Sequence, residues 1–307
     1  MALLKFLYLL SFLAVSWSCP FQEDLLPCTC KPVIAGFNIV CTNFNSSIEL
    51  KNAFRTLKRE KANVFILLIQ GVHIENSLPT DLFNDMKINQ ITVKESKLRL
   101  PRPVFSGLDS ILNVLNVADN SLVINSGEQF ILARLNDLDE LYIKSNHLEK
   151  VRDNMLNEKV PNVKMIELDS NDISEIEDRA FANLISLKKI SLADNRIKVI
   201  RRSMFPNPAT HLTRIDISFN EIRSLPENIF ETMPALKEVI LSGNELKNLP
   251  ESTWDPVWEH LNQVLLFDNP LECDESMDWI KERPKPYNFD GYCVSPKSMS
   301  GRSVKDI

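Results

Sequence analysis

The stretch from residue 138 to residue 197 contains three copies of one pattern. The copies read LDELYIKSNHL at 138–148, VKMIELDSNDI at 163–173 and LKKISLADNRI at 187–197. Each fits the template L-x-x-L-x-L-x-x-N-x-L, in which apolar residues alternate with other residues before an asparagine. The alternation has the period of a β-strand and not the 3.6-residue period of a helix. We therefore expect a short strand in each copy, with the leucine positions turned inward and the residues between them turned outward.

The pattern continues in both directions at a nearly constant spacing. Further copies are LNVLNVADNSL, LTRIDISFNEI, LKEVILSGNEL and LNQVLLFDNPL, and two degenerate copies have Val72 and Ser96 at the asparagine position. Successive positions lie 24 to 26 residues apart, which gives nine copies in register. The asparagines of this predicted column are Asn120, Asn146, Asn171, Asn195, Asn220, Asn244 and Asn269. Such a period is typical of a solenoid, in which each winding buries its apolar face only against its neighbours.

Both recurring side-chain types have a physical reason. An asparagine offers one acceptor oxygen and two N–H donors, so a column of asparagines can satisfy buried turn backbone and join one winding to the next. Asparagine also tolerates turn conformations, which would explain how a chain of 307 residues manages with seven glycines. An aromatic residue recurs about ten residues after most asparagine positions, and we expect this second column to fill the convex side. Its members are Phe83, Phe105, Phe130, Phe181, Phe205, Phe230 and Trp254.

These repeats resemble the leucine-rich repeat family. The resemblance implies an α/β repeat fold, a leucine-rich repeat solenoid (horseshoe) with a parallel β-sheet on the concave face. The convex side would consist of turns and short helices, and disulfide caps would close both ends. We expect a signal peptide at 1–18, an N-terminal cysteine cap at 19–63, about nine leucine-rich repeats at 64–268 and a C-terminal cysteine cap at 269–307.

The six cysteines lie only near the two ends of the chain. An even number in an exported chain indicates disulfides, and the absence of histidines near either group disfavours zinc. The segment CPFQEDLLPCTC resembles the N-terminal cap of extracellular leucine-rich repeat proteins, which implies the pairs Cys19–Cys30 and Cys28–Cys41. The stretch NPLECDESMDWI resembles the matching C-terminal cap, although Glu275 replaces one of its cysteines, and implies the pair Cys273–Cys293.

The first eighteen residues have the composition of a secretory signal. Lys5 is followed by an apolar run from Phe6 to Val15 and then by small residues before Cys19. The run is shorter than the ~20 residues that span a bilayer. We expect a chain without a membrane span that is secreted into the extracellular space. Asn45 begins the only N-x-S/T sequon and is a predicted glycosylation site.

The composition excludes several function classes. The chain has 41 acidic and 35 basic residues, a net charge of −6, which argues against a nucleic-acid partner. The glycines are too far apart for either common phosphate-binding loop, and the motifs G-x-S-x-G, H-E-x-x-H and C-x-x-C do not occur. We therefore predict no catalytic residues, no cofactor and no metal site.

The outward strand positions are the candidate binding surface. They change from mixed charge in the middle of the chain to apolar near its C-terminal end. The predicted protein-binding residues are Tyr142, Glu167, Asp169, Arg214 and Asp216, with Ile240, Leu265 and Phe267 as an apolar anchor. Two alternatives stay open: these positions are an ordinary solvated surface, and the apolar end lies under the C-terminal cap.

A more specific resemblance concerns the arrangement of the whole chain. The amphipathic segment IELKNAFRTLKREKANVFILLI, the repeats around SGLDSILNVLNVADNSL and the tryptophan before N-P-L-x-C are similar to a secreted arthropod family, that of the Oplophorus-luciferin 2-monooxygenase non-catalytic subunit. We expect a secreted non-catalytic protein that binds an extracellular or secreted protein through its concave face. The resemblance implies the alternative, a non-catalytic stabilising subunit of a secreted enzyme complex. Whether the chain forms a homodimer stays open.

Overall fold

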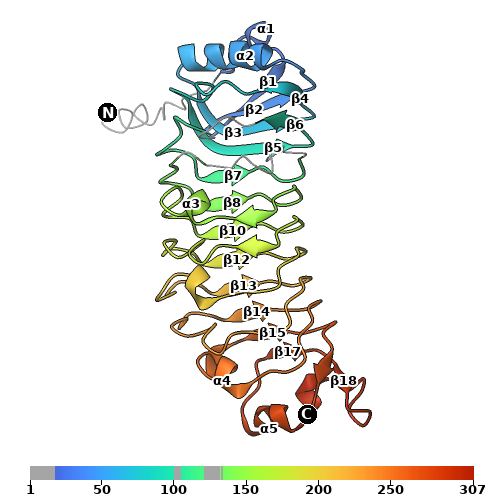
Figure 1. Cartoon of the computed structure of the whole chain (residues 1–307). Coiled ribbons are helices and arrows are strands. Elements are labelled where there is room, and N and C mark those ends of the chain that lie inside the picture. Colours follow the sequence, from blue (N-terminus) through green and yellow to red (C-terminus); the bar gives the residue numbers. More distant parts are fainter. Residues whose placement is uncertain (1–17, 100–104, 121–131, 133) are drawn as a thin grey trace, which may run out of the picture.

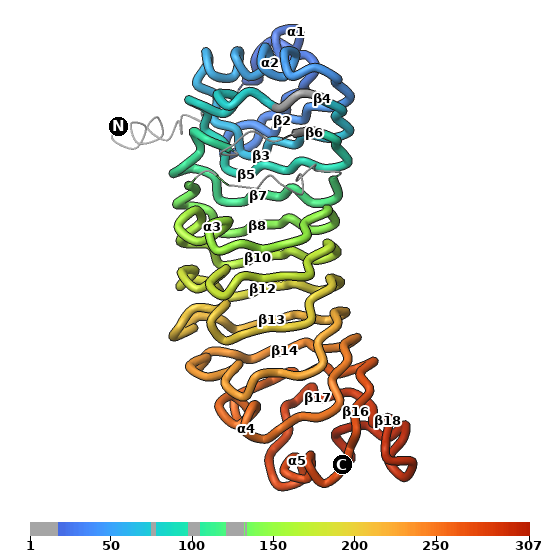
Figure 2. Tube along the Cα trace, viewed as in Figure 1, coloured from blue at the N-terminus to red at the C-terminus, as the bar shows by residue number. Residues whose placement is uncertain are grey.

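The chain is described by a computed structural model that covers residues 18–99, 105–120, 132 and 134–307. Its windings are stacked one upon another along the molecule, and the described ends lie at opposite ends of the stack (Figures 1 and 2). The predicted solenoid with a parallel sheet is confirmed. The signal peptide predicted at 1–18 falls outside the described residues except for Ser18, and Phe130 also lies outside them.

One sheet of twelve strands runs through the whole stack. Its first two strands, β1 (Cys28–Val33) and β2 (Gly36–Thr42), are antiparallel, and every later pairing is parallel. The remaining strands, in their order across the sheet, are β3 (Asn63–Gln70), β5 (Lys87–Lys94), β7 (Val114–Asn116), β8 (Glu140–Tyr142), β10 (Met165–Glu167), β12 (Lys189–Ser191), β13 (Arg214–Asp216), β14 (Glu238–Ile240), β15 (Gln263–Leu265) and β17 (Asn288–Asp290). The sheet therefore includes β2 from the N-terminal cap and β17 from the C-terminal cap.

The repeat period fixes the register of the strands. Ile166 lies opposite Leu141 on one side and Ile190 on the other, and all three are buried. The neighbouring outward position, Glu167, lies between Tyr142 and Ser191. A slip by one residue would exchange the two sets and turn polar side chains into the core, so the apolar alternation holds each strand in place.

Short strand pairs and a few helices complete the windings. The pairs are β4 (His73–Ser77) with β6 (Lys97–Arg99), β9 (Lys150–Val151) with β11 (Glu175–Ile176), and β16 (Leu271–Glu272) with β18 (Cys293–Ser295). The helices are α1 (Gln22–Leu25), α2 (Ser47–Arg59), α3 (Asp153–Leu156), α4 (Glu251–Trp254) and α5 (Trp279–Glu282), with 3₁₀ turns η1 (Arg202–Met204), η2 (Trp258–His260), η3 (Glu275–Met277) and η4 (Val304–Asp306). Among the residues that the structure describes, no helix has the length and apolar character that a membrane span requires.

Helix α2 forms because its first turn is capped and one of its faces is apolar. The Ser46 hydroxyl accepts a hydrogen bond from the backbone N–H of Ile48 at 3.2 Å. Leu50, Phe54 and Leu57 recur at helical spacing and are buried. The helix therefore packs on the N-terminal windings by the face that these three residues form.

The asparagine column is a ladder of buried amides. The Oδ1 atom of Asn195 accepts from the N–H of Ile173 in the preceding winding at 3.0 Å. Its Nδ2 donates to the carbonyl oxygen of Leu168 in that winding at 3.0 Å and to that of Leu192 in its own winding at 3.1 Å. The same bonds recur at Asn171, Asn220, Asn244 and Asn269. Each amide thus ties two windings together.

The left-handed residue of each turn is the one before the asparagine. Asp194 has a φ of 54°, Ser170 of 52° and Gly243 of 67°. All seven ladder asparagines lie within the described residues, and none of them has a positive φ. Our expectation that the asparagine itself supplies the turn conformation is therefore wrong. The asparagine amide holds the neighbouring winding, and its predecessor, mostly a small polar residue or glycine, reverses the chain.

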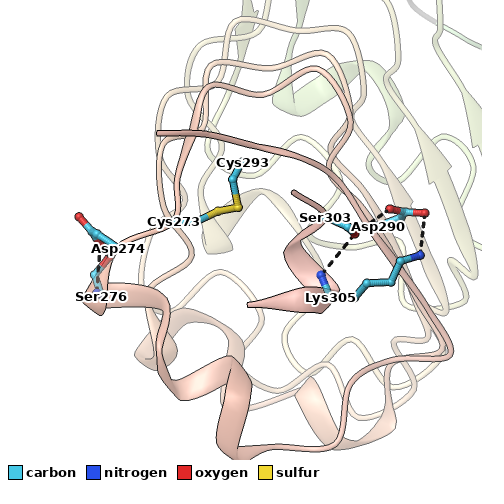
Figure 3. Close-up of a disulfide and its surroundings, with 7 residues drawn as sticks. All are labelled: Cys273, Asp274, Ser276, Asp290, Cys293, Ser303 and Lys305. Atoms are coloured by element: carbon cyan, nitrogen blue, oxygen red, sulfur yellow. Dashed lines mark hydrogen bonds and ion pairs between the residues drawn. A yellow bond between two sulfur atoms is a disulfide. The ribbon is translucent and has the colours of Figure 1, made fainter. Parts of the chain in front are cut away.

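Three disulfides close the two ends of the solenoid. The structure joins Cys19 to Cys30 and Cys28 to Cys41 in the first cap, and Cys273 to Cys293 in the second (Figure 3).

In the C-terminal cap, Asp290 of β17 also receives the end of the chain. The Lys305 ammonium lies 3.2 Å from one of its carboxylate oxygens, and the Ser303 hydroxyl donates to the other at 3.3 Å (Figure 3). These contacts hold η4 against β17.

Candidate functional site

The candidate site is the outward face of strands β8 to β17, which we call the sheet face. These strands lie side by side from about the middle of the molecule downward in Figure 1. From β8 to β15, their central row contains six positions in strict register: Tyr142, Glu167, Ser191, Asp216, Ile240 and Leu265. The structure thus brings five of the predicted binding residues into one row. Arg214 lies on the same strand as Asp216, and Asp169 and Phe267 each lie two residues beyond the end of a strand.

Tyr142 begins a hydrogen-bonded network at the N-terminal end of this face. Its hydroxyl donates to Glu140 Oε2 at 2.8 Å. Burial raises the pKa of Tyr142, and the hydrogen bond to Glu140 raises it further, so the phenol stays protonated and keeps its donor role. Lys144, in the same winding, lies with its Nζ 3.4 Å from Oε2 of Glu167 in the next winding. The network holds two large side chains, Tyr142 and Lys144, in fixed positions at the surface.

Asp169 is the carboxylate that this network leaves without a cation. Its Oδ1 accepts from the backbone N–H of Ala193 at 2.9 Å, and it also accepts from the Ser191 side chain. Burial raises the pKa of Asp169, and the nearby charges of Glu167 and Asp216 raise it further against these two hydrogen bonds. No lysine or arginine of the described part of the chain forms an ion pair with it. The carboxylate is therefore held in place by neutral donors and can accept a cation from a partner.

Arg214 is clamped between two carboxylates. It donates to Glu238 Oε2 at 2.7 Å and to Asp216 Oδ2 at 3.1 Å. The other oxygen of Asp216 accepts from the Ser218 hydroxyl at 2.7 Å. Asp216 is only 9% exposed, so it lies beneath Arg214 and orients the guanidinium. The sequence placed Asp216 among the contact residues, and in the structure its carboxylate is bonded to Arg214 and Ser218 of its own winding.

The apolar C-terminal end of the sheet face is only partly accessible. Ile240 is 8% exposed and is therefore not an exposed anchor, whereas Leu265 and Phe267 are half-buried. The Phe267 ring lies 5.8 Å from the ring of Tyr292, which comes from the C-terminal cap and is 50% exposed. The cap therefore lies beside Phe267 without burying it completely. The cap extends the outward row of Phe267 by one more aromatic side chain.

Sequence reasoning left Tyr292 and several supporting residues out of the site. Tyr292 lies 25 residues after Phe267, which is the repeat step, so the period carried into the cap would have found it. The residues Glu140, Lys144 and Glu238 face outward by the same alternation. Their hydrogen bonds to Tyr142, Glu167 and Arg214 depend on rotamers, which the period does not specify.

The site has the chemistry of a contact surface. Among the described residues, no group of three or more histidine, cysteine, aspartate or glutamate side chains is arranged to hold a metal ion. His147, on the flank of the windings, faces Asp172 with Nδ1 3.1 Å from a carboxylate oxygen, and it is largely exposed. Fixed carboxylates, a fixed guanidinium and accessible aromatic rings can bind cations, hydrogen-bond donors and apolar groups of a partner.

A sequence comparison identifies the repeats. A family model described as leucine rich repeat matches residues 136–197, 161–210 and 210–271. Residues 136–271 of the chain therefore consist of leucine-rich repeats. No curated protein sequence matches it. Domains of this class are typical of protein–protein interaction and are generally not enzymes.

Solved structures share the fold of this chain at low identity. A chain of the octameric complex of latrophilin 3, Unc5D and FLRT2 aligns with a TM-score of 0.51 at 20% identity, over 80% of this chain and 89% of that one. A chain of the mouse RP105/MD-1 complex aligns with a TM-score of 0.65 at 16% identity, over 87% and 45%. A chain of the TLR13–ssRNA13 complex aligns with a TM-score of 0.55 at 16% identity, over 74% and 35%. This chain spans less than half of the last two. Such complexes include both protein and RNA ligands, so the fold alone does not indicate the class of partner. The class of partner has to be inferred from the chemistry of the surface.

The uncompensated carboxylate of Asp169 gives a testable pH dependence. Because its pKa is raised in the folded state, the folded chain binds this proton more tightly than the unfolded chain, and stability falls as pH rises through the folded pKa. We expect Asp169→Asn to be more stable than the wild type at neutral pH. The difference should shrink as pH falls towards ~3, where Asp169 is largely protonated in both states. Urea unfolding at several pH values measures this.

The matched control for that experiment is Asp172→Asn. Asp172 forms an ion pair with Arg196 at 2.6 Å, so its loss should lower stability, by less than about 1 kcal/mol for an exposed pair. A lower stability of the Asp169→Asn variant at neutral pH would show that the carboxylate is compensated after all.

Proposed function

We propose that this chain is a secreted, non-catalytic leucine-rich repeat protein that binds another protein through its sheet face. The observation that carries the proposal is the pre-organised network on that face. Tyr142 is held by Glu140, and Arg214 is held by Glu238 and Asp216, with accessible aromatic rings a few strands away. Tyrosine and arginine fixed in this way lose little conformational entropy on binding and are the residue types that dominate interface energetics.

The shape and charge of the sheet face favour a protein over a small molecule or a nucleic acid. The central row crosses six strands, and with a strand spacing of ~4.8 Å this makes a surface about 24 Å long. Its outward charges include four carboxylates, Glu140, Glu167, Asp169 and Glu238, against Lys144, Lys189 and Arg214. An acidic excess repels phosphate, so the surface suits a protein with basic and apolar side chains.

Secretion is supported by covalent chemistry and exposure. Three disulfides close the caps, and disulfides of this kind persist in oxidising compartments. Asn45 of the sequon is exposed, immediately before the Ser46 cap of α2, and is therefore accessible to a glycan. The sequence of residues 1–18 adds the pattern of a signal peptide.

The test compares capture by three forms of the full chain. The wild type, the double variant Tyr142→Ala/Arg214→Ala and the convex-side control Asn183→Ala/Ile185→Ala are immobilised and exposed to the secretions of the source tissue. We expect a protein retained by the wild type and by the control to bind the sheet-face variant about ten-fold or more weakly. Equal retention by the sheet-face variant, with unchanged thermal unfolding, would place the binding surface elsewhere. Identification of the retained protein as an enzyme would support the alternative, a stabilising subunit of an enzyme complex.

A further inference from the structure

Phe219 differs from the other residues of its column. This column consists of the residues that directly precede the ladder asparagines. All of them have a positive φ: Asp119, Ser145, Ser170, Asp194, Phe219, Gly243 and Asp268. Phe219 adopts this conformation with a φ of 53° and is 56% exposed. A bulky side chain is unfavourable in the left-handed region, and exposure gives no burial energy in return. The fold itself therefore does not explain an aromatic residue at this position, and such positions are candidates for function.

The next winding makes room for the Phe219 ring. A Cβ atom added to Gly243 would lie 2.4 Å from Cδ1 of Phe219, so the ring lies against Gly243 and a larger residue there would force the ring to move. The backbone N–H of Gly243 in turn donates to the carbonyl of Phe267 at 2.7 Å, and the Phe267 ring contacts Tyr292. We call Phe219, Gly243, Phe267 and Tyr292 the aromatic rim. It is an accessible apolar strip along the carboxyl ends of β13 to β17.

Two free carboxylates flank this strip. Asp194 precedes Phe219 in the column and Asp268 follows Gly243, and both are exposed. Within the described part of the chain, neither side chain has an ion-pair or hydrogen-bond partner.

The neighbouring flank of the windings differs in this respect. There the charges are paired: Arg196 with Asp172 at 2.6 Å, Arg223 with Glu245 at 2.7 Å and Lys247 with Glu272 at 2.9 Å. Beside Phe219 and Gly243, the unpaired charges of this column are therefore the two carboxylates of Asp194 and Asp268.

We propose that the aromatic rim docks a protein segment in which a large apolar side chain lies beside arginine or lysine. The apolar side chain packs on Phe219 and Phe267, and the basic side chains reach Asp194 and Asp268. From the strand spacing these carboxylates lie about 5 Å and about 10 Å from Phe219 along the column, within reach of an arginine. The inference rests on the proposal that the chain binds a protein, and it names the chemistry of the segment that is bound.

The experiment uses a displayed library of random peptides of about a dozen residues, long enough to cover the strip in an extended conformation. The library is selected on the immobilised wild-type chain, and one enriched peptide is synthesised for affinity measurements. The variants are Phe219→Asn, which suits a positive φ and removes the ring, and Asp194→Asn/Asp268→Asn, which removes the two charges. Ile185→Asn is the matched control, since it removes an exposed apolar side chain elsewhere. The double variant Tyr142→Ala/Arg214→Ala tests whether the peptide binds to the sheet face instead.

We expect enriched peptides to combine an aromatic residue or leucine with a nearby arginine or lysine. The synthesised peptide should bind Phe219→Asn about ten-fold more weakly and Asp194→Asn/Asp268→Asn several-fold more weakly, with a smaller salt dependence for the latter. Binding to Ile185→Asn should equal that of the wild type. The melting temperature of Phe219→Asn should match or exceed that of the wild type, which separates loss of binding from loss of folding.

Other outcomes would overturn the inference. One is a selection that enriches no peptides, or only peptides without basic residues. Another is a selected peptide that binds Phe219→Asn as tightly as it binds the wild type. A third is a wild type that is dimeric in sedimentation while Phe219→Asn is monomeric, because the strip would then pair two copies of the chain. Peptides that bind Phe219→Asn but not Tyr142→Ala/Arg214→Ala would refute the aromatic rim and leave the proposed function standing. Peptides lost only on Phe219→Asn, together with a protein partner still retained by Tyr142→Ala/Arg214→Ala, would refute the sheet face alone.

Discussion

Replacing Asn195 by alanine should lower the free energy of unfolding by about 3 to 5 kcal/mol, because it leaves several buried polar groups without partners. The N–H of Ile173 loses its acceptor, and the carbonyl of Leu168 loses the donor that reaches it from the next winding. Asn195 is 8% exposed, so water cannot easily replace these bonds. The windings on either side of the substitution also lose a direct link, and in a solenoid such nearest-neighbour links hold the stack together.

The measurement is urea unfolding of the oxidised chain, followed by far-UV circular dichroism. Asn183→Ala is the matched control. It removes the same side chain from an exposed position in the preceding winding, and it should change stability by less than about 0.5 kcal/mol. A loss at Asn195 no larger than that at Asn183 would mean that the ladder amides do not stabilise the stack.

Replacing Trp258 by alanine should cost about 3 to 5 kcal/mol, because it opens a cavity at the centre of an aromatic cluster. The Trp258 ring lies 6.0 Å from that of Trp254 in the last repeat. Its ring also lies 4.7 Å from that of Trp279 and 5.3 Å from that of Phe289, both in the C-terminal cap. Trp258 is 1% exposed and therefore joins the cap to the repeats through buried surface.

The same unfolding assay tests Trp258→Ala against Tyr287→Ala. Tyr287 is an aromatic residue of the same cap and is fully exposed, so its removal should be close to neutral. Because the cap covers the last winding, Trp258→Ala should also make the C-terminal windings exchange their amide hydrogens faster than the N-terminal ones. Uniform exchange along the chain, or a stability equal to that of Tyr287→Ala, would contradict the linking role of the cluster.

Much of the fold follows from the sequence because it repeats. Ile166 and Asn171 occupy the positions that the template gives them, since a period of 24 to 26 residues specifies which residue faces the core and which neighbour it meets. The turn was different. Asp194 and Ser170, not the asparagines after them, take the left-handed conformation. The template identifies the asparagine because it is the same in most copies. It is the same because its amide makes the hydrogen bonds between windings, and the residue before it, which varies, makes the turn.

For the candidate site, the sequence specified which side chains face outward. The tertiary structure specified which of them are accessible and which support others. Alternation alone placed Tyr142, Glu167 and Leu265 on one face, because a strand sends successive side chains to opposite sides. It did not distinguish Arg214 at the surface from Asp216 beneath it, nor Phe267, accessible beside Tyr292, from the buried Ile240.

The sequence by itself therefore determined the winding, the inward and outward positions, the amide column and the place of the caps, since each is a local pattern repeated along the chain. Only the tertiary structure decided which outward side chains are paired, which are covered, and that Phe219 lies exposed against Gly243. The physical reason is that exposure and charge pairing depend on side-chain conformations in the adjacent windings. Those windings are about a repeat away along the chain, and the period fixes where their residues lie but not how their side chains turn.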